Sequence, residues 1–228
     1  PLSFLAVLAG YFLMRPALFH PARNRPADAG LVHQIAEGLR YGWGTPPVRF
    51  ILILVAFIGM FGYNFNVIIP LVAEFVLHAG PEKFGLLSSF LGAGALVSAF
   101  AIAGMGRRSP AMMLAASVVF CVALYALAFS TWYLLSGVLL LLLGLSGAAL
   151  MTTANTSLQL GAPDEMRGRI ISIFILLQAG STPVGGFLTG YLSSHAGVPS
   201  ALAIQASLCV LGVALAALQL SIARRNDP

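Results

Sequence analysis

The sequence has 228 residues, of which 59% are hydrophobic and 8% are charged. Because a soluble domain of average composition carries about 25% charged residues, this composition excludes an ordinary soluble enzyme, a disordered chain and a free nucleic-acid-binding module. The formal net charge is +5, but the arginines are scattered along the chain and form no basic cluster. The two cysteines, Cys121 and Cys209, both lie in apolar stretches. Their positions predict no disulfide framework and no CxxC metal site. We expect no other metal site and no cofactor.

The chain opens with an apolar stretch from Leu2 to Met14 that ends at Arg15. This stretch is shorter than the roughly 20 apolar residues that a membrane-spanning helix needs, and the first residue is Pro1, not Met. We therefore expect residues 1–18 to be the end of a spanning helix that starts upstream, and the sequence to be a part of a longer protein.

Residues 19–47 form the one long polar segment. Within it Leu31, Ile35 and Leu39 recur every four residues, with polar side chains between them. This spacing predicts a short amphipathic helix that lies on the membrane surface and ends at Gly42. A docking site for another protein is the alternative interpretation.

Four charge-free stretches follow, and their lengths predict the membrane spans. They contain 24, 23, 55 and 54 residues and cover 50–73, 84–106, 109–163 and 170–223. A bilayer-spanning helix needs about 20 apolar residues. We therefore expect one span in each of the first two stretches and a pair in each of the last two, which polar residues interrupt near the middle.

The spans must be helices, because every backbone amide inside hydrocarbon has to bond within its own segment, and the alternation of a β-barrel is missing. The predicted fold class is an all-α membrane protein with a six-helix transmembrane bundle over residues 48–222. Prolines at the predicted helix starts support this, and Thr45 and Ser109 offer side-chain oxygens as helix caps. The spans are expected near 48–76, 83–105, 110–129, 132–160, 169–193 and 198–222.

The basic residues predict the orientation of the bundle. If Arg15 is cytoplasmic, the segments 15–49, 106–110, 161–169 and 223–228 share that side and carry 11 of the 12 lysines and arginines. The positive-inside rule then places the polar segment 19–47, which we call the central loop, and the C-terminal tail, 223–228, in the cytoplasm. We expect a multi-pass protein of a bacterial cytoplasmic (inner) membrane.

Between the fourth and fifth spans, residues 163–169 read PDEMRGR, which resembles the Px(D/E)xxRGR loop of major facilitator superfamily exporters. The resemblance continues at 155–159 and 183–190, and residues 3–7 and 39–41 are similar to the enterobactin-exporter-like and macrolide-efflux-like branch. It implies that the chain comprises the end of helix 6, the central loop and helices 7–12. The N-terminal six-helix half of the same protein would then be its missing partner.

The charged loop at 163–169 suggests a cytoplasmic gate. Its acidic side chains are favoured at the start of the following helix, and its arginines can reach the ends of neighbouring helices. Charge anchoring under the positive-inside rule is the alternative. The loop at 104–108 keeps a basic pair but lacks the Asp of the family's GxxxDRxGR pattern. The gate candidates are Asp164, Glu165, Arg167, Gly168, Arg169, Arg107 and Arg108.

Polar and helix-bending residues inside the spans are candidates for the transport path. Pro183, Gly185 and Gly186 are hinge candidates because proline removes a backbone bond, with tight static packing as the alternative. Polar side chains in a membrane usually face a cavity or the bundle interior. The substrate-cavity candidates are Tyr63, Asn64, Asn66, Gln178 and Thr182. For Asn155 and Gln159, near the basic end of their span, interhelical hydrogen bonding is the favoured interpretation.

The sequence thus predicts part of a secondary active transporter that exports small amphipathic molecules, of drug or siderophore type, by proton-coupled alternating access. Its partners would be a small-molecule substrate and the lipid bilayer, and not nucleic acid. Glu74 lies near the outer end of its span, so we interpret it as interfacial and expect the proton-carrying acid in the missing half.

Two other classes of protein are alternatives. Residues 144–147, GLSG, match the GxSG pattern of rhomboid-type intramembrane serine proteases. A nucleophilic serine needs a base within hydrogen-bond reach, and all four histidines fall in loops or at span ends. We therefore predict that the protein is not an enzyme. The remaining alternative is a non-transporting scaffold or channel subunit.

Overall fold

A computed structural model describes residues 31–104 and 109–226 of the chain. The chain divides into a unit of residues 1–33 and a unit of residues 34–228, and every contact given below lies within the second unit. The described residues contain helices and no strand. The predicted end of helix 6, the gate candidates Arg107 and Arg108, and the last two residues lie outside the described residues.

The elements follow in chain order, with α for α-helices and η for single turns of π-helix. They are α2 (Leu31–Gly44), α3 (Pro46–Phe57), η2 (Ile58–Gly62), α4 (Phe65–Leu71), η3 (Val72–Val76), α5 (Pro81–Gly104), α6 (Pro110–Ala128), α7 (Tyr133–Gly161), α8 (Asp164–Ile175), η4 (Leu176–Gly180), α9 (Thr182–Ala196) and α10 (Val198–Asn226).

Six segments of the described residues are long and apolar enough to cross a membrane, which confirms the predicted fold class. The first span combines α3, η2, α4 and η3, and the fifth combines α8, η4 and α9. The spans are Pro46–Val76, Pro81–Gly104, Pro110–Ala128, Tyr133–Gly161, Asp164–Ala196 and Val198–Ile222.

Most helix ends lie within two residues of their predicted positions, and the fifth span is the exception. It begins at Asp164, so the RGR motif lies inside α8 and not in a loop before it. Ala162, the residue before Pro163, has extended backbone angles that end α7, and two carboxylates occupy the first turn of α8. Ser109 caps α6 by accepting a hydrogen bond from the Met112 amide, whereas the Thr45 side chain makes no such bond at α3.

The fourth span, α7, packs against both α5 and α6, and α10 packs against α3, α6 and α9. The crossing of α5 and α7 depends on two glycines. A β-carbon built on Gly94 would collide with the carbonyl oxygen of Leu141, and one built on Gly144 with that of Leu91. The two backbones therefore touch, as small residues permit in membrane helix pairs.

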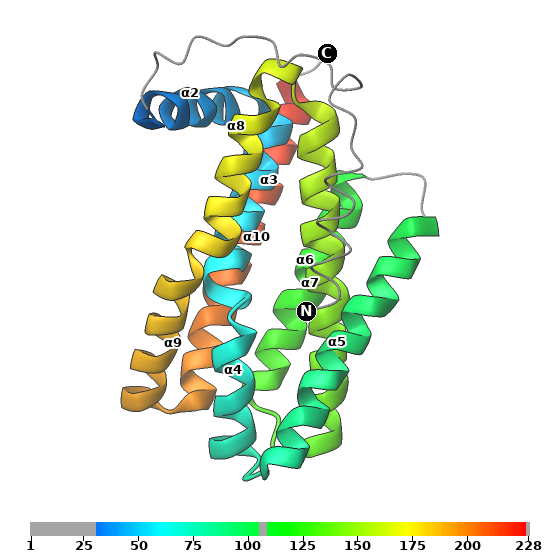
Figure 1. Ribbon diagram of the computed structural model, residues 1–228, viewed down its shortest axis with the longest axis vertical. Helices are drawn as coiled ribbons and strands as arrows, with labels where there is room; N and C mark the ends of the chain where they lie inside the picture. The colour runs from blue at the N-terminus through cyan, green and yellow to red at the C-terminus, as the bar shows by residue number, and fades with distance from the viewer. Residues whose placement is uncertain (1–30, 105–108, 227–228) are drawn as a thin grey trace, which may run out of the picture. The chain divides into compact units, whose positions relative to one another are not determined.

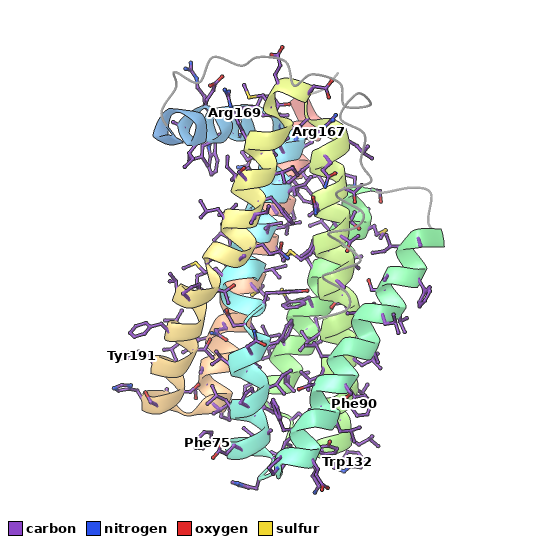
Figure 2. The ribbon with its side chains drawn as sticks, viewed as in Figure 1. Phe75, Phe90, Trp132, Arg167, Arg169 and Tyr191 are labelled. Carbon is purple, nitrogen blue, oxygen red and sulfur yellow. The ribbon has the colours of Figure 1, made fainter. Side chains whose placement is uncertain are left out.

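The two ends of the bundle differ in charge. Arg167 and Arg169 lie at one end, which we call the basic end, and Phe75 and Trp132 lie at the other, which we call the opposite end (Figure 2). At the basic end α2 lies across the beginning of α8 (Figure 1). The helix at Leu31–Gly44 stands where the spacing of Leu31, Ile35 and Leu39 predicted one, and continues two residues past Gly42.

Candidate functional site

The first span is interrupted near its middle. The π-turn η2 ends at Gly62, Tyr63 and Asn64 belong to no helix, and α4 begins at Phe65. In η2 the Tyr63 amide donates to the carbonyl of Ile58, five residues back, at 2.9 Å. A π-turn widens a helix by one residue and occurs often at functional sites. Pro70 lies inside α4 and has no backbone N–H to donate. The second π-turn, η3, begins directly after α4 ends.

Asn64 closes this interruption with its side chain. Its Nδ2 donates to the carbonyl oxygen of Met60 at 2.6 Å. In an uninterrupted α-helix that carbonyl would accept from the backbone amide of residue 64 itself. The side chain thus satisfies a backbone group that the break leaves free, as hydrocarbon surroundings require. The residue is 1% exposed, and its Oδ1 has no hydrogen-bond partner among the described residues.

The fifth span is interrupted in a similar way. The π-turn η4 separates α8 from α9, and Ser181 forms a turn between them. The hydroxyl of Ser181 donates to the carbonyl of Leu177, and that of Thr182 donates to the carbonyl of Gln178 at 3.2 Å. Pro183 occupies the first turn of α9, where its missing amide costs nothing. The irregular backbone therefore precedes the predicted hinge residues.

The two interruptions lie against each other. A β-carbon on Gly59 of η2 would lie 3.0 Å from the carbonyl oxygen of Leu177 in η4. A β-carbon on Gly185 of α9 would collide with the carbonyl of Met60 and the amide of Asn64. Both glycines thus allow backbone-to-backbone contact between the first and fifth spans. We call this region, residues 58–64 and 176–185, the paired break.

Four of the five predicted cavity residues lie within the paired break. Asn64 is buried there, and Tyr63, Gln178 and Thr182 are half-buried. The Tyr63 ring lies toward Gly147 of α7, where it would contact an added β-carbon at 2.9 Å. Asn66 is exposed on α4. The paired break thus presents uncharged hydrogen-bonding groups within a membrane span.

Two arginines of the RGR motif connect α8 to its neighbours at the basic end. Arg167 pairs with Asp164 at 2.8 Å, and its Nε donates to the carbonyl of Gln159, in the last turn of α7, at 2.8 Å. Arg169 pairs with Glu37 of α2 at 2.6 Å. Of the other gate candidates, Glu165 and Gly168 are exposed.

The packing of α2 supports the second of these ion pairs. A β-carbon on Gly38 would lie 3.3 Å from Cβ of Arg169 and closer still, 2.8 Å, to the side chain of Ile173. A β-carbon on Gly42 would lie 2.8 Å from the side chain of Leu52 in α3. The helix α2 therefore lies against the basic ends of both interrupted spans.

The polar stripe on α7 bonds within its own helix. Gln159 Nε2 donates to Asn155 Oδ1 at 2.7 Å, and the Thr156 hydroxyl donates to the carbonyl of Thr152 at 2.9 Å. The expectation that Asn155 and Gln159 bond between helices was wrong, because side chains four residues apart on a helix are already neighbours.

Sequence reasoning missed Gln205 of α10 and Thr189 of α9. Gln205 is fully buried and its Nε2 donates to the hydroxyl of Thr189, which in turn donates to the carbonyl of Gly185 at 2.7 Å. This chain of bonds holds α10 to the turn of α9 that contacts Asn64. An amide in the middle of an apolar span was the available signal, since such groups seldom face lipid.

The GxSG motif has the geometry of a packing element. Ser146 is buried and its hydroxyl donates to the carbonyl of Leu142 in the same helix at 2.6 Å, while Gly144 lies against the backbone of α5. His195 lies on α9, where its Nδ1 is 3.0 Å from the carbonyl of Tyr191. These contacts give the serine a structural role in α7.

The sequence profile of a family described as transmembrane secretion effector matches residues 1–227 of the chain. The multidrug efflux pump Tap of Mycolicibacterium fortuitum is 32% identical over 184 residues, which cover 78% of this chain and 44% of that protein. The multidrug efflux pump Tap of Mycobacterium tuberculosis (strain ATCC 25618 / H37Rv) is 26% identical over 229 residues, which cover 99% of this chain and 53% of that protein. The chain thus spans about half the length of the curated relatives it matches. No solved structure matches it.

Proposed function

Because the chain belongs to the transmembrane secretion effector family of major facilitator superfamily transporters, we propose that it is the C-terminal half of an exporter of small amphipathic molecules. The exporter works by alternating access across the bacterial cytoplasmic membrane, with the basic end in the cytoplasm. The curated relatives are multidrug efflux pumps about twice as long as this chain, which supports both the activity and a second half.

The observation that carries this proposal is the paired break. Transporters often bind their substrates where spanning helices are discontinuous, because the interrupted backbone and nearby polar side chains offer hydrogen bonds at membrane depth. Here the interruptions of the first and fifth spans adjoin each other, and Asn64, Gln178 and Thr182 lie at them. We propose that Asn66, which is exposed on α4, faces the substrate together with Gln178.

The chemistry of these groups favours an amphipathic substrate of drug or siderophore type. Amide side chains donate and accept hydrogen bonds but carry no charge, and the surrounding spans are apolar. A strongly anionic substrate would require basic side chains, and the arginines of the described spans lie toward the basic end.

The gate in this proposal is the set of contacts at the basic end. Arg167 joins α8 to the last turn of α7, and Arg169 joins α8 to Glu37 of α2. Alternating access requires contacts on one side of the membrane that form in one state and open in the other. These two arginines hold the basic end of the fifth span to its neighbours, and their release would let that end move.

The proton-carrying acid belongs, in this proposal, to the missing N-terminal half. Among the described residues of the spans, the other acidic side chains lie in the first turns of the second and fifth spans. Glu74 lies near the end of the first span, where it is exposed at the opposite end of the bundle. A proton carrier is expected deeper in the membrane, where burial shifts its ionisation. This half then shapes the substrate path and the gate, and export needs both halves.

Efflux by the full-length protein tests the proposal. In cells that lack other pumps, Asn66→Ala and Gln178→Ala should each slow the efflux of ethidium or change the preference among amphipathic dyes, because each removes a hydrogen-bonding group from the path. Gln219→Ala is the matched control, since it removes an amide from a position on α10 that lies outside the paired break and is not part of the Gln205–Thr189 chain of bonds. Unchanged efflux and unchanged preference in both variants would contradict the assignment.

A further inference from the structure

A cavity lies at the opposite end of the bundle, away from the paired break. There the first span ends in the π-turn η3, which contains Glu74, and His78 follows with a positive φ of 47°. The amide of Ala79 donates to the carbonyl of Ala73 at 2.7 Å, so the chain turns back sharply before α5 begins at Pro81. Left-handed backbone at a non-glycine residue is uncommon and often marks a functional site.

This turn encloses one side of a cavity of about 420 Å³ between the first and second spans. The volume lies within the range of about 300–1,000 Å³ that is typical of pockets for drug-sized molecules. Apolar residues and a glycine form most of its lining, and Glu74 contributes the charge. The lining residues other than Glu74 are Pro70, Ala73, Ala79, Gly80, Pro81 and Phe84.

The carboxylate of Glu74 is available to a ligand in this cavity. Both ion pairs that form among the described residues lie at the basic end. The lysine nearest to Glu74 in the sequence, Lys83, lies over the ring of Tyr133 with its Nζ 5.8 Å from the ring centre. The Tyr133 hydroxyl also donates to the Lys83 carbonyl at 2.9 Å, which holds this residue toward α7.

One carboxylate and one aromatic ring in an apolar pocket favour a positively charged ligand over a neutral or negatively charged one. A monovalent organic cation gains Coulomb attraction to Glu74 and, over the exposed ring of Phe84, a cation–π interaction. A neutral molecule of the same shape gains the apolar contacts alone, and an anion is repelled. The proline rings and alanine side chains around the carboxylate suit the apolar body of an amphipathic cation.

From this geometry we propose that the cavity at Glu74 is a binding site for lipophilic organic cations. The proposal rests on the proposed function, to which it adds a substrate class and a second location. Because the cavity lies at the end opposite to the basic gate, it is a late site on the export path, which a cation occupies after it leaves the paired break. Glu74 is then a specificity-determining residue and not merely an interfacial one.

The direct test is binding of tetraphenylphosphonium to the purified full-length protein, measured by equilibrium dialysis. We expect Glu74→Gln to weaken binding by about fivefold or more, since loss of even 1 kcal/mol of attraction is about fivefold. The matched control is Glu82→Gln, which removes an exposed carboxylate from the first turn of α5, outside the lining of the cavity. It should leave the dissociation constant within about twofold.

A second variant tests the cavity without changing charge. A β-carbon on Gly80 has no neighbour within 4 Å, so Gly80→Leu should fill the cavity without a clash and weaken tetraphenylphosphonium binding. A β-carbon on Gly92 of α5 has equally open surroundings, and Gly92→Leu should leave binding unchanged.

Efflux then separates this proposal from the proposed function. In cells, Glu74→Gln should slow the efflux of tetraphenylphosphonium and leave that of a neutral amphipathic dye within about twofold of the unmodified protein. Equal loss for both compounds, or tetraphenylphosphonium binding unchanged by Glu74→Gln and Gly80→Leu, would overturn the cation site. Failure of the unmodified protein to export any amphipathic dye would refute the proposed function, while the dialysis result would still decide whether Glu74 binds cations.

Discussion

Replacing Gly185 by alanine should separate the two interrupted spans, whereas the same replacement at Gly186 should be tolerated. A β-carbon on Gly185 would collide with the carbonyl oxygen of Met60 and the amide of Asn64. The Met60 carbonyl is backbone and can yield only if its helix moves. A β-carbon on Gly186 would lie 3.5 Å from a methyl group of Val67, which is ordinary van der Waals contact.

The size of the effect follows from two opposing contributions. Forcing an extra carbon into a packed site costs about 1–3 kcal/mol, and replacing glycine by alanine within a helix gains about 0.5–1 kcal/mol. Because the clash at Gly185 is with backbone, its cost lies in the upper part of that range, and we expect Gly185→Ala to lower the free energy of unfolding by about 1–2.5 kcal/mol and Gly186→Ala to raise it slightly. For a unit of this size, 1 kcal/mol corresponds to roughly 2–4 °C in Tm.

Two measurements test this prediction. The Tm of both variants of the full-length protein is measured in the same detergent, and ethidium efflux is measured in cells that express the variants at matched levels. Gly185→Ala should lower the Tm by roughly 2–10 °C and slow efflux, because it displaces Asn64 and the backbone of η2. Gly186→Ala should match the unmodified protein in efflux and keep or slightly raise the Tm. Equal Tm values for the two variants would refute the inference that the interrupted spans touch through Gly185.

Three further predictions concern the gate, the helix crossing and the missing half. Reversing the charge of either Arg169 or Glu37 should impair efflux at low salt, and the double variant Arg169→Glu/Glu37→Arg should recover part of it; no recovery in the double variant would argue against their ion pair. Gly94→Leu should abolish the α5–α7 contact and reduce the amount of folded protein, whereas Gly92→Leu should not, as detected by size-exclusion chromatography of a fluorescent fusion. Sequencing the gene upstream of this segment should reveal six more spans with a second RGR- or DRxGR-type loop, and their absence would contradict the assignment as a C-terminal half.

The spans could be predicted from the sequence because their signal is local. Any charge inside hydrocarbon is costly wherever the chain folds, so the spacing of charges predicted six spans before any packing was known. Pro46, Pro81 and Pro110 start α3, α5 and α6, since proline suits the first turn of a helix in almost any surroundings.

The paired break could be predicted only in part, because it depends on contacts between distant segments. Pro183 predicted a bend in the fifth span, but proline is tolerated in a first turn, and the irregular backbone precedes it at 176–181. The polarity of Asn64 indicated a cavity or an interhelical bond. Its actual bond to the Met60 carbonyl depends on the backbone angles of Tyr63 and Asn64, which periodicity does not specify.

The contacts of the RGR motif could also be predicted only in part from the sequence. The sequence indicated that Arg167 and Arg169 could reach neighbouring helix ends, and Arg167 does bond to the last turn of α7. The partner of Arg169 could not be identified, because Glu37 lies on a separate helix whose position is determined by the packing of Gly38 against Ile173.

Thiol accessibility at the paired break tests the central claim most directly. In the full-length protein with Cys121 and Cys209 replaced by alanine, single cysteines would be placed as Asn66→Cys and Gln178→Cys, with Val122→Cys on the exposed face of α6 as the control. A membrane-impermeant thiol reagent, applied to right-side-out and inverted vesicles, should modify the first two and not the third, and ethidium should slow both reactions. Cysteines at 66 and 178 that stay unmodified from both sides, or react equally fast with and without ethidium, would contradict a substrate path through the paired break.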